Sequence, residues 1–302
     1  QTIMSDNKFK VPAKAFWLQF LAARGVTNWI PDKLFIQLSY QFNMGKSLNL
    51  EHPQTYNEKL QWLKLYDRKP EYTKMVDKYA VRTYVSKRIG DEYLIPLLGV
   101  WNQPDEINYD KLPNQFVLKC NHDSGGVLIC KDKSELDINA ATKFLRKCLS
   151  RNFYYRAREW PYKNIQRKII AEKYMVDESG YELKDYKFFC FNGKCRAVFI
   201  ATDRGADTRF DFFDPEFHHL PIKCGHDNAE KEIKKPASWE LMIKLAEKLS
   251  EGIPQVRVDL YDVFGQVYFG ELTFFHFGGK KPFYPEKWDY VFGSWIDLPD
   301  KG

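Results

Sequence analysis

The strongest structural signal in the sequence is a two-stranded pattern near the C-terminal end, VRVDLYDVFGQVYFGELTFF, residues 256–275. β-Branched and aromatic residues alternate with polar ones, a pattern that predicts strands. Phe264-Gly265-Gln266 predicts a three-residue hairpin loop, because glycine readily adopts the left-handed conformation. The segment therefore favours an antiparallel hairpin in which Val263 pairs with Val267.

Counting outward from this loop places charged side chains on one face of the hairpin. Two facing carboxylates, Asp259 and Glu271, would repel each other unless a cation lies between them. With Arg257 beside them, they predict a magnesium ion that bridges to a phosphate. The alternative is an exposed edge hairpin with one surface ion pair. The predicted pairs on this face are Tyr261 with Phe269, Asp259 with Glu271, and Arg257 with Thr273.

The opposite face of the hairpin is apolar and is predicted to face a core. The chain has 302 residues, of which 44% are apolar, so it can bury a large core. Its net charge of +6 is compatible with an anionic ligand but too mild to require nucleic acid. The apolar positions are Val256, Val258, Leu260, Leu272 and Phe274.

Basic residues also gather between 146 and 168. This clustering is more typical of a solvated helix face than of a groove for a polyanion. Aromatic residues make up 16% of the chain, and Trp160, Trp288 and Trp295 are candidate sugar-stacking platforms, although most tryptophans belong to cores. The basic residues are Arg146, Lys147, Arg151, Arg156, Arg158, Lys163, Arg167 and Lys168.

Cysteine spacing and hydropathy indicate where in the cell the protein is expected. The six cysteines include no CxxC pair, which favours reduced thiols and a cytoplasmic location. Cys224 with His218, His219 and His226 fits no standard zinc spacing. The apolar run 16–23 contains Gln19 and predicts an amphipathic helix, and no run is long enough to cross a bilayer.

The first ninety residues are helical in pattern. Thr55-Tyr56-Asn57-Glu58 is a capping box that opens one helix, and a second is expected from Glu71 to Ile89, ended by Gly90. On that second helix Lys78 and Arg82 would share a face.

Short strands then alternate with helices. Strands at 115–120 and 127–130 flank the turn His122-Asp123-Ser124-Gly125-Gly126, and a helix at 138–151 precedes a strand at 168–175. Asn192-Gly193 predicts a type I′ hairpin, and Ser238 is expected to cap a helix that ends near Glu251. These elements predict an α+β fold with three regions: a helical region at 1–92, a small subdomain at 93–175 and a large subdomain at 176–302.

Several charged side chains recur beside these strands. Lys119 ends the strand before the glycine-rich turn, where backbone amides suit nucleotide phosphates. Glu172 interrupts an apolar strand, and Asp185 and Lys187 share one strand face. The turn matches neither GxxxxGK[ST] nor GxGxxG, so the phosphate sites of those two motifs are not expected.

In this order, the segments FVLKCNHDSGG, IIAEKYM, LKDYKFFCFNGK and RVDLYDVFGQVYFGELTF resemble the ATP-grasp superfamily, and within it the TupA-like branch named for teichuronopeptide synthesis. The resemblance runs from about Asp77 to Pro285. It implies an ATP-grasp fold, in which two α+β subdomains hold ATP between antiparallel sheets, with ATP and Mg²⁺ as cofactors.

The resemblance also implies roles for individual residues. Lys78 and Lys119 match the lysines that bracket the phosphates, and the turn with Ser124, Gly125 and Gly126 matches the loop that closes over them. The other matches are Glu172, Lys173 and Tyr174 in the adenine-binding hinge, Asp185 and Lys187 near the ribose and phosphates, Asp259 and Glu271 as magnesium ligands, and Arg257 and Lys119 as catalytic residues. Thr273 stands where many relatives have a metal-binding asparagine, which leaves the number of ions open.

The activity implied by the resemblance is an ATP-dependent ligase that joins a carboxylate to an amine through an acylphosphate. The TupA-like branch points to surface polysaccharide or capsule synthesis, with an amino acid joined to a uronic acid. A kinase that uses the same site, a glycosyltransferase with Asp211 and Asp214 as its acidic motif, and a non-catalytic nucleotide-binding module remain alternatives. No nucleic acid partner and no membrane span are expected, and the sequence does not define the oligomeric state.

Overall fold

Two antiparallel sheets form the framework of the protein in a computed structural model that describes residues 10–180, 183–202 and 208–301. The small sheet has the order β1-β4-β2-β3, and the large sheet has the order β10-β9-β5-β6-β7-β8. The small sheet comprises β1 (Leu97–Trp101), β2 (Phe116–Cys120), β3 (Val127–Cys130) and β4 (Ile169–Lys173). The large sheet comprises β5 (Asp185–Phe191), β6 (Lys194–Thr202), β7 (Arg209–Phe213), β8 (His219–Leu220), β9 (Val256–Val263) and β10 (Gln266–Thr273).

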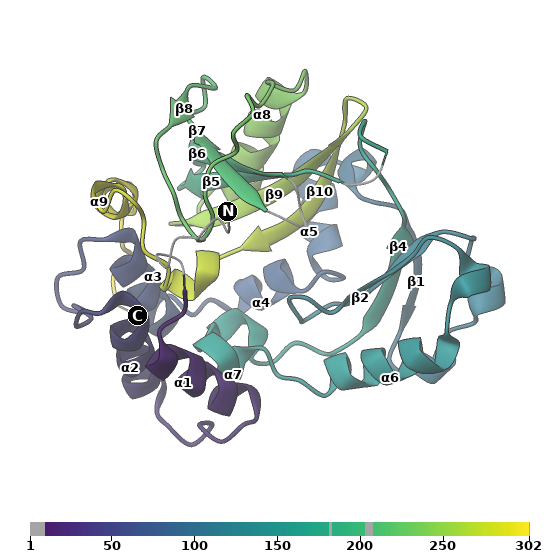
Figure 1. The fold of residues 1–302 in the computed structure, drawn as a ribbon, viewed down its shortest axis with the longest axis horizontal. Coiled ribbons are helices and arrows are strands. Elements are labelled where there is room, and N and C mark those ends of the chain that lie inside the picture. The colour runs from purple at the N-terminus through teal and green to yellow at the C-terminus, as the bar shows by residue number, and fades with distance from the viewer. Residues whose placement is uncertain (1–9, 181–182, 203–207, 302) are drawn as a thin grey trace, which may run out of the picture.

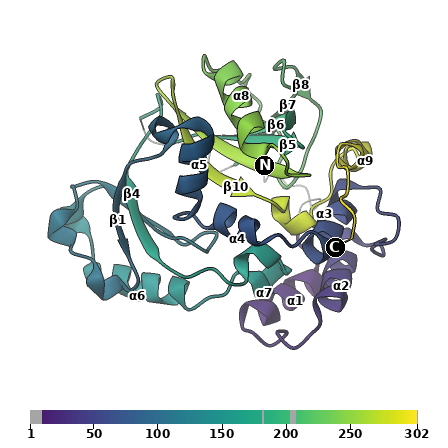
Figure 2. The ribbon, with the colours of Figure 1, turned by 180° about the vertical axis from the view of Figure 1, so that it is seen from behind.

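Helices surround the two sheets and connect them (Figure 1). Helix α6 lies along the small sheet, α8 covers the large sheet, and α4 and α5 lie between the sheets in both views (Figure 2). The helices are α1 (Ala13–Ala23), α2 (Asp32–Met44), α3 (Tyr56–Tyr66), α4 (Pro70–Val76), α5 (Val81–Ile89), α6 (Ile138–Leu149), α7 (Tyr154–Ala157), α8 (Trp239–Ser250) and α9 (Lys287–Ser294).

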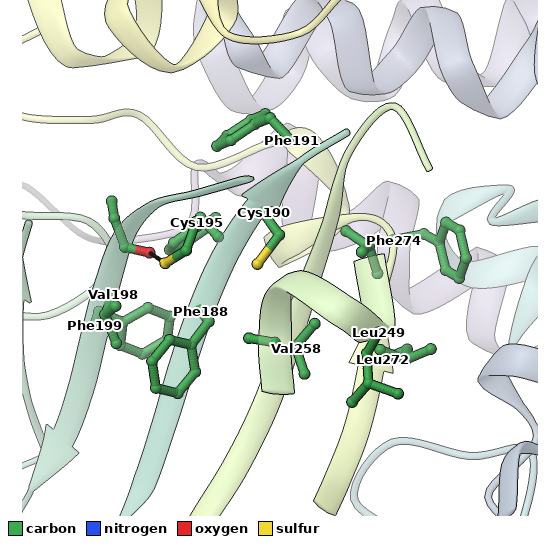
Figure 3. Close-up of a cluster of buried hydrophobic side chains, with 14 of the residues drawn as sticks. Phe188, Cys190, Phe191, Cys195, Val198, Phe199, Leu249, Val258, Leu272 and Phe274 are labelled. Carbon is green, nitrogen blue, oxygen red and sulfur yellow. Dashed lines mark hydrogen bonds between the residues drawn. The ribbon is translucent and has the colours of Figure 1, made fainter. Parts of the chain in front are cut away.

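Each sheet has its own hydrophobic core. Around the large sheet, Phe188, Val258 and Leu272 pack with neighbouring apolar side chains and Leu249 of α8 (Figure 3). The apolar face predicted for the C-terminal hairpin is confirmed, since all five of its residues are buried there. Helices α3, α4 and α5 contribute to this same core, whereas β2, β4 and α6 build the second one. The three-region division at 92/93 and 175/176 stays a prediction.

The C-terminal hairpin has the predicted strand pairing at its charged end, but its loop and the pairs next to the loop differ from the prediction. Its loop has two residues, Phe264 and Gly265, both with positive φ, as in a type I′ turn. Val263 therefore pairs with Gln266, and the predicted pairs of Val263 with Val267 and of Tyr261 with Phe269 are wrong. The register then shifts between Phe269 and Glu271, where a bulge inserts one extra residue.

This bulge restores the predicted alignment at the charged end of the hairpin. Asp259 pairs with Glu271, and Arg257 pairs with Thr273. Gly270 supplies the extra residue. A Cβ added there would lie 2.9 Å from the Tyr261 ring and 3.0 Å from the Asp259 carbonyl oxygen, so only glycine fits without movement.

The prediction of a single helix from Glu71 to Ile89 is wrong, because the helix is interrupted at Asp77. This residue has an extended ψ of 112°, and its carboxylate accepts hydrogen bonds from the amides of Tyr79 and Ala80. That local bond competes with helix continuation. Lys78 therefore lies in the break between α4 and α5, not on a helical face shared with Arg82.

The predicted helix caps and the Asn192-Gly193 turn are confirmed in part. The capping box at Thr55 and Glu58 is confirmed, and Asn192-Gly193 forms the predicted turn with both φ values positive. Ser238 precedes α8 but makes no capping hydrogen bond; its hydroxyl instead donates to the carboxylate of Asp262. Helix α8 begins without the predicted cap.

Candidate active site

A cavity of about 550 Å³ opens between the two sheets, a size suited to a small-molecule ligand. Its walls come from β2, β3 and β4 of the small sheet and from β5, β9 and β10 of the large sheet. Segments that lie far apart in the sequence therefore meet at one place. The predicted site residues that line the cavity are Lys78, Lys119, Ser124, Gly125, Glu172, Lys173, Tyr174, Asp185, Lys187, Asp259 and Glu271.

On the small-sheet wall, a lysine and a glutamate from neighbouring strands form an ion pair. Lys119 of β2 donates to the Glu172 carboxylate of β4 at 2.6 Å, and Arg82 of α5 lies 3.7 Å from the same carboxylate. Because two cations surround one carboxylate, this wall keeps net positive charge. Such a wall suits the phosphates of a nucleotide.

Lys78 connects the glycine-rich turn to the large sheet. Its backbone amide donates to the Asn121 carbonyl, and its ammonium donates to the Asp123 carbonyl at 2.9 Å. The same ammonium lies 3.7 Å from the Glu271 carboxylate on β10. The break after α4 thus positions a cation at the junction of the two sheets.

The turn itself leaves space for a ligand. Gly125 has φ +90°, and a Cβ added there would meet nothing within 4 Å, so the turn borders open space at this point. Ser124 is exposed beside it. Gly126 does not line the cavity; its carbonyl accepts a hydrogen bond from the Cys120 amide and closes the turn.

On the large-sheet wall, Asp259 is the centre of an ionic network and is only 1% exposed. Arg257 donates to both of its carboxylate oxygens, at 2.6 and 2.7 Å, and Lys187 of β5 donates to it at 2.5 Å. Lys187 also lies 3.3 Å from Asp185. Burial opposes the charge of Arg257, but Asp259 and Glu271 outweigh burial and raise the pKa of the guanidinium above its usual value.

Glu271 faces the cavity and keeps 40% of its side chain exposed. Burial would raise its pKa, but Lys78, Lys187 and Arg257 outweigh this and lower the pKa to about 2. Thr273 connects Glu271 to Arg257, because its hydroxyl accepts from Arg257 at 3.0 Å and contacts the Glu271 carboxylate at 3.3 Å. Glu271 is therefore an ionised carboxylate at neutral pH.

The donor set suits a magnesium ion shared with a phosphate. Across the described part of the chain, no three His, Cys, Asp or Glu side chains gather into a group that could hold a metal alone. Mg²⁺ usually binds through one or two carboxylates and completes its coordination with phosphate oxygens and water. Asp259 and Glu271 are such a pair. Their role as ligands, and that of Thr273, stays a prediction.

Apolar side chains form another part of the cavity, and the sequence did not single them out. Ile95, Val117, Met175, Val176 and Leu183 line it, together with Val127 and Ile129 of β3, which are partly exposed. The strands predicted at 115–120, 127–130 and 168–175 include Val117, Val127, Ile129 and Met175, but their strand pattern does not indicate which apolar side chains face a ligand. Such side chains suit a flat ring such as a purine base.

His276 is a second residue of the site that the sequence did not indicate. It lies in the short 3₁₀ turn His276–Gly279, and its Nδ1 accepts a hydrogen bond from Arg257 Nη1 at 2.8 Å. Burial, together with the charges of Arg257 and Lys187, holds its pKa well below the usual value. His276 is therefore neutral and can act as an acceptor that positions Arg257.

Some candidates from the sequence lie outside the cavity. Arg257 and Thr273 lie behind Asp259 and Glu271 and do not line it. Trp288 and Trp295 pack against the large core. In the basic cluster, Arg158 is fully buried, so the prediction of a solvated face is wrong for this residue.

The acidic motif considered for a glycosyltransferase lies elsewhere. Asp211 lines a separate cavity of about 440 Å³, where it binds His219 at 3.0 Å and the Ala229 amide at 2.9 Å. Asp214 pairs with His218. Both carboxylates therefore already have histidine partners, and neither faces the cavity between the sheets.

Comparison with known proteins shows the family. The family model of the TupA-like ATP-grasp proteins matches residues 58–297, most of the chain. The chain belongs to the TupA-like ATP-grasp family. The α+β ATP-grasp fold expected from the sequence is thus confirmed. A search of curated proteins finds none that matches.

Solved structures similar to this TupA-like protein are ATP-grasp ligases. They include D-alanine–D-alanine ligase from Bacillus anthracis complexed with ATP, with 18% identity, a TM-score of 0.39, and coverage of 66% of this chain and 53% of that one. The ATP-grasp ligase PsnB with minimal precursor, Mg and ADP has 9% identity, a TM-score of 0.40, and coverage of 83% and 65%. D-Alanine–D-alanine ligase from Helicobacter pylori has 14% identity, a TM-score of 0.42, and coverage of 80% and 69%. This chain spans about half of the Bacillus anthracis ligase.

Proposed function

We propose that this TupA-like protein is an ATP- and Mg²⁺-dependent ligase that joins a carboxylate to an amine and releases ADP and phosphate. The observation that supports this proposal most is the cavity between the sheets, which combines lysines from both walls with the carboxylates of Asp259 and Glu271. Family membership adds the expectation that ATP is the nucleotide.

The cavity divides into an apolar part and a charged part. We assign the apolar side chains around Val117 and Leu183 to the adenine ring, together with the chain at Glu172, Lys173 and Tyr174, where β4 ends. The charged part then receives the phosphates. Lys119 would approach them from the small sheet, Lys78 from the break between α4 and α5, and Lys187 from β5.

In the proposed reaction, a substrate carboxylate attacks the γ-phosphorus of ATP, ADP leaves, and an acylphosphate forms. An amine then attacks the acyl carbon, loses its proton and displaces phosphate. Mg²⁺ bound at Asp259 and Glu271 would neutralise the phosphate charges. The resemblance assigns Arg257 to the acylphosphate, but Arg257 lies behind the carboxylates, so it would act by holding Asp259 in position. The turn with Ser124, Gly125 and Gly126 would limit hydrolysis by water.

The substrates we propose are a uronic acid carboxylate and an amino acid, joined by an amide in bacterial surface polysaccharide or capsule synthesis. This part of the proposal rests on the resemblance to the TupA-like branch. A cytoplasmic location accords with the six buried free thiols. No helix among the described residues is long and apolar enough to cross a membrane.

The test is the release of ADP and phosphate from ATP and Mg²⁺, measured across uronic acids and amino acids. We expect phosphate release that requires both substrates and that disappears in the double variant Asp259→Ala/Glu271→Ala. The exposed carboxylates Glu216 and Asp300 provide a matched control, since replacing both with alanine should leave the rate unchanged. ADP without free phosphate would indicate a kinase and contradict the proposal.

A further inference from the structure

Helix α1 has an unusual orientation, with small side chains facing the protein and large ones facing solvent. The residues of α1 that are buried are Ala15 and Ala22, seven positions apart on one helix face. Phe16, Trp17 and Leu21 are exposed instead, and Trp17 keeps 57% of its surface accessible. A helix held only by its core would show the opposite arrangement.

The exposed apolar residues continue beyond α1. Of the sixteen large hydrophobic side chains that are exposed in the described part of the chain, seven lie between residues 11 and 34. Trp29, in the turn after α1, is 81% exposed, the highest value among them. Such a concentration of exposed apolar side chains in one segment is typical of an interaction site. The seven residues, called the N-terminal surface below, are Val11, Phe16, Trp17, Leu21, Val26, Trp29 and Leu34.

The charges around the N-terminal surface are almost all positive. Lys10, Lys14, Arg24 and Lys33 are exposed within residues 10–34, where the single carboxylate is Asp32. That carboxylate is already neutralised inside the protein. It binds Arg68 at 2.7 Å and the Tyr154 hydroxyl at 2.5 Å, and Arg158 lies 3.3 Å away.

The segment is held firmly to the rest of the protein. Arg158, fully buried at the end of α7, donates to the carbonyls of Thr27 and Ile30 in the turn between α1 and α2. Its guanidinium also stacks 4.2 Å from the Phe35 ring centroid. Both views place α1 and α2 at the edge of the molecule, away from the two sheets (Figures 1 and 2). The apolar side chains are thus presented on a fixed support at the periphery.

We propose that the N-terminal surface docks onto the interface of an anionic lipid bilayer. Tryptophan and other amphipathic aromatic side chains concentrate at the headgroup level, and nearby lysines and arginines are attracted to anionic lipids. Both features occur together at the N-terminal surface. A protein partner would also bury the apolar side chains, but the four exposed cations Lys10, Lys14, Arg24 and Lys33 match a negatively charged lipid surface. Docking would be peripheral, because no helix in the described ranges can span a bilayer.

Vesicle co-sedimentation tests this proposal with the unmodified protein. We expect the protein to sediment with vesicles of phosphatidylcholine and phosphatidylglycerol, to bind phosphatidylcholine alone much more weakly, and to dissociate at high salt. Tryptophan fluorescence should shift to shorter wavelength on binding. The measurement needs no nucleotide or substrate, so its failure would leave the proposed ligase activity untouched.

Three variants separate the apolar and ionic contributions. Trp17→Ser/Trp29→Ser should abolish binding and the fluorescence shift, and each of Lys14→Gln and Arg24→Gln should weaken binding by about fivefold. The control Leu241→Ser/Tyr290→Ser removes exposed apolar side chains elsewhere and should bind as the wild type does. Circular dichroism melting of each variant confirms that it is folded.

Two results would overturn the proposal. The first is that the wild type does not sediment with anionic vesicles at low salt. The second is light scattering that shows a dimer, lost in Trp17→Ser/Trp29→Ser, without vesicle binding. In that case the N-terminal surface would be an interface between two copies of the chain.

Discussion

At the residue scale, the candidate site depends on how Arg257 is held. Its guanidinium binds Asp259 through two hydrogen bonds, Thr273 through a third and His276 through a fourth. Bidentate pairing with a carboxylate fixes the plane of an arginine. His276 occupies a remaining donor, so the guanidinium has a single orientation behind the carboxylate pair.

Replacing His276 tests this arrangement. His276→Leu leaves Arg257 Nη1 buried without its acceptor, which should reduce the free energy of unfolding by about 1–3 kcal/mol and slow phosphate release. His276→Gln can supply a side-chain oxygen and should recover much of both losses. Urea denaturation and the phosphate-release assay measure the two effects. Equal behaviour of the leucine and glutamine variants would contradict a hydrogen-bonding role.

At the element scale, the β10 bulge sets the position of Glu271. Without the extra residue at Gly270, the two-residue loop would keep the shifted register along the whole hairpin, and Glu271 would not face Asp259. Gly270→Ala places a Cβ against the Asp259 carbonyl and the Tyr261 ring.

We therefore expect Gly270→Ala to reduce the free energy of unfolding by about 1–3 kcal/mol and to weaken nucleotide binding in the presence of Mg²⁺. Gly252→Ala provides a control for the loss of a glycine away from the site: Gly252 differs from Gly270 in having a positive φ of +75° and open surroundings, so its replacement should cost stability without changing nucleotide binding. Denaturation and calorimetric titration measure the two effects. Unchanged nucleotide binding in Gly270→Ala would show that the bulge does not position Glu271.

A second element-scale contact joins α9 to the start of α3. One carboxylate oxygen of Asp289 accepts hydrogen bonds from both the backbone amide and the side-chain amide of Asn57, each at 3.0 Å. Burial raises the pKa of Asp289 from 3.8 to about 6, even though these hydrogen bonds lower it. The folded protein therefore holds this proton more tightly than the unfolded chain does.

The raised pKa of Asp289 predicts how the free energy of unfolding changes with pH. Because the folded pKa is raised, the stabilisation is fully present below pH 3.8 and is lost as the pH rises through about 6, a change of roughly 3 kcal/mol. Asp289→Asn keeps an oxygen for both hydrogen bonds and should remove this loss, so it should be more stable than the wild type at neutral pH. Urea denaturation across this pH range measures the effect, with the exposed Asp300→Asn variant as control. If Asp289→Asn showed the same pH dependence of stability as the wild type, the prediction would be contradicted.

The elements of the fold that follow from local pattern could be predicted from the sequence. Strand alternation, the Asn192-Gly193 turn and the Thr55 capping box are local signals, and the structure has all three. The bulge at Gly270 and the orientation of Lys78 could not be predicted, since each depends on contacts between segments that are apart in the sequence. Lys78, for example, is oriented by the Asn121 and Asp123 carbonyls. His276 was missed for the same reason. The break at Asp77 is local, but the hydrogen bonds of its carboxylate to the Tyr79 and Ala80 amides compete with a helical pattern that continues on both sides.

At the scale of the whole molecule, the site exists only where the two sheets meet. The small sheet brings Lys119 and the glycine-rich turn, and the large sheet brings Lys187, Asp259 and Glu271. Each sheet has its own core, and Lys78 lies at their junction. We propose that this junction binds ATP with Mg²⁺ through the carboxylate pair.

Calorimetric titration with a non-hydrolysable ATP analogue, with and without Mg²⁺, tests this claim most directly. The wild type should bind the analogue more tightly when Mg²⁺ is present. In Asp259→Asn/Glu271→Gln the analogue should still bind through the lysines, but Mg²⁺ should no longer strengthen binding. A wild type that bound no nucleotide, or a variant that kept the full effect of Mg²⁺, would contradict ATP binding through this carboxylate pair.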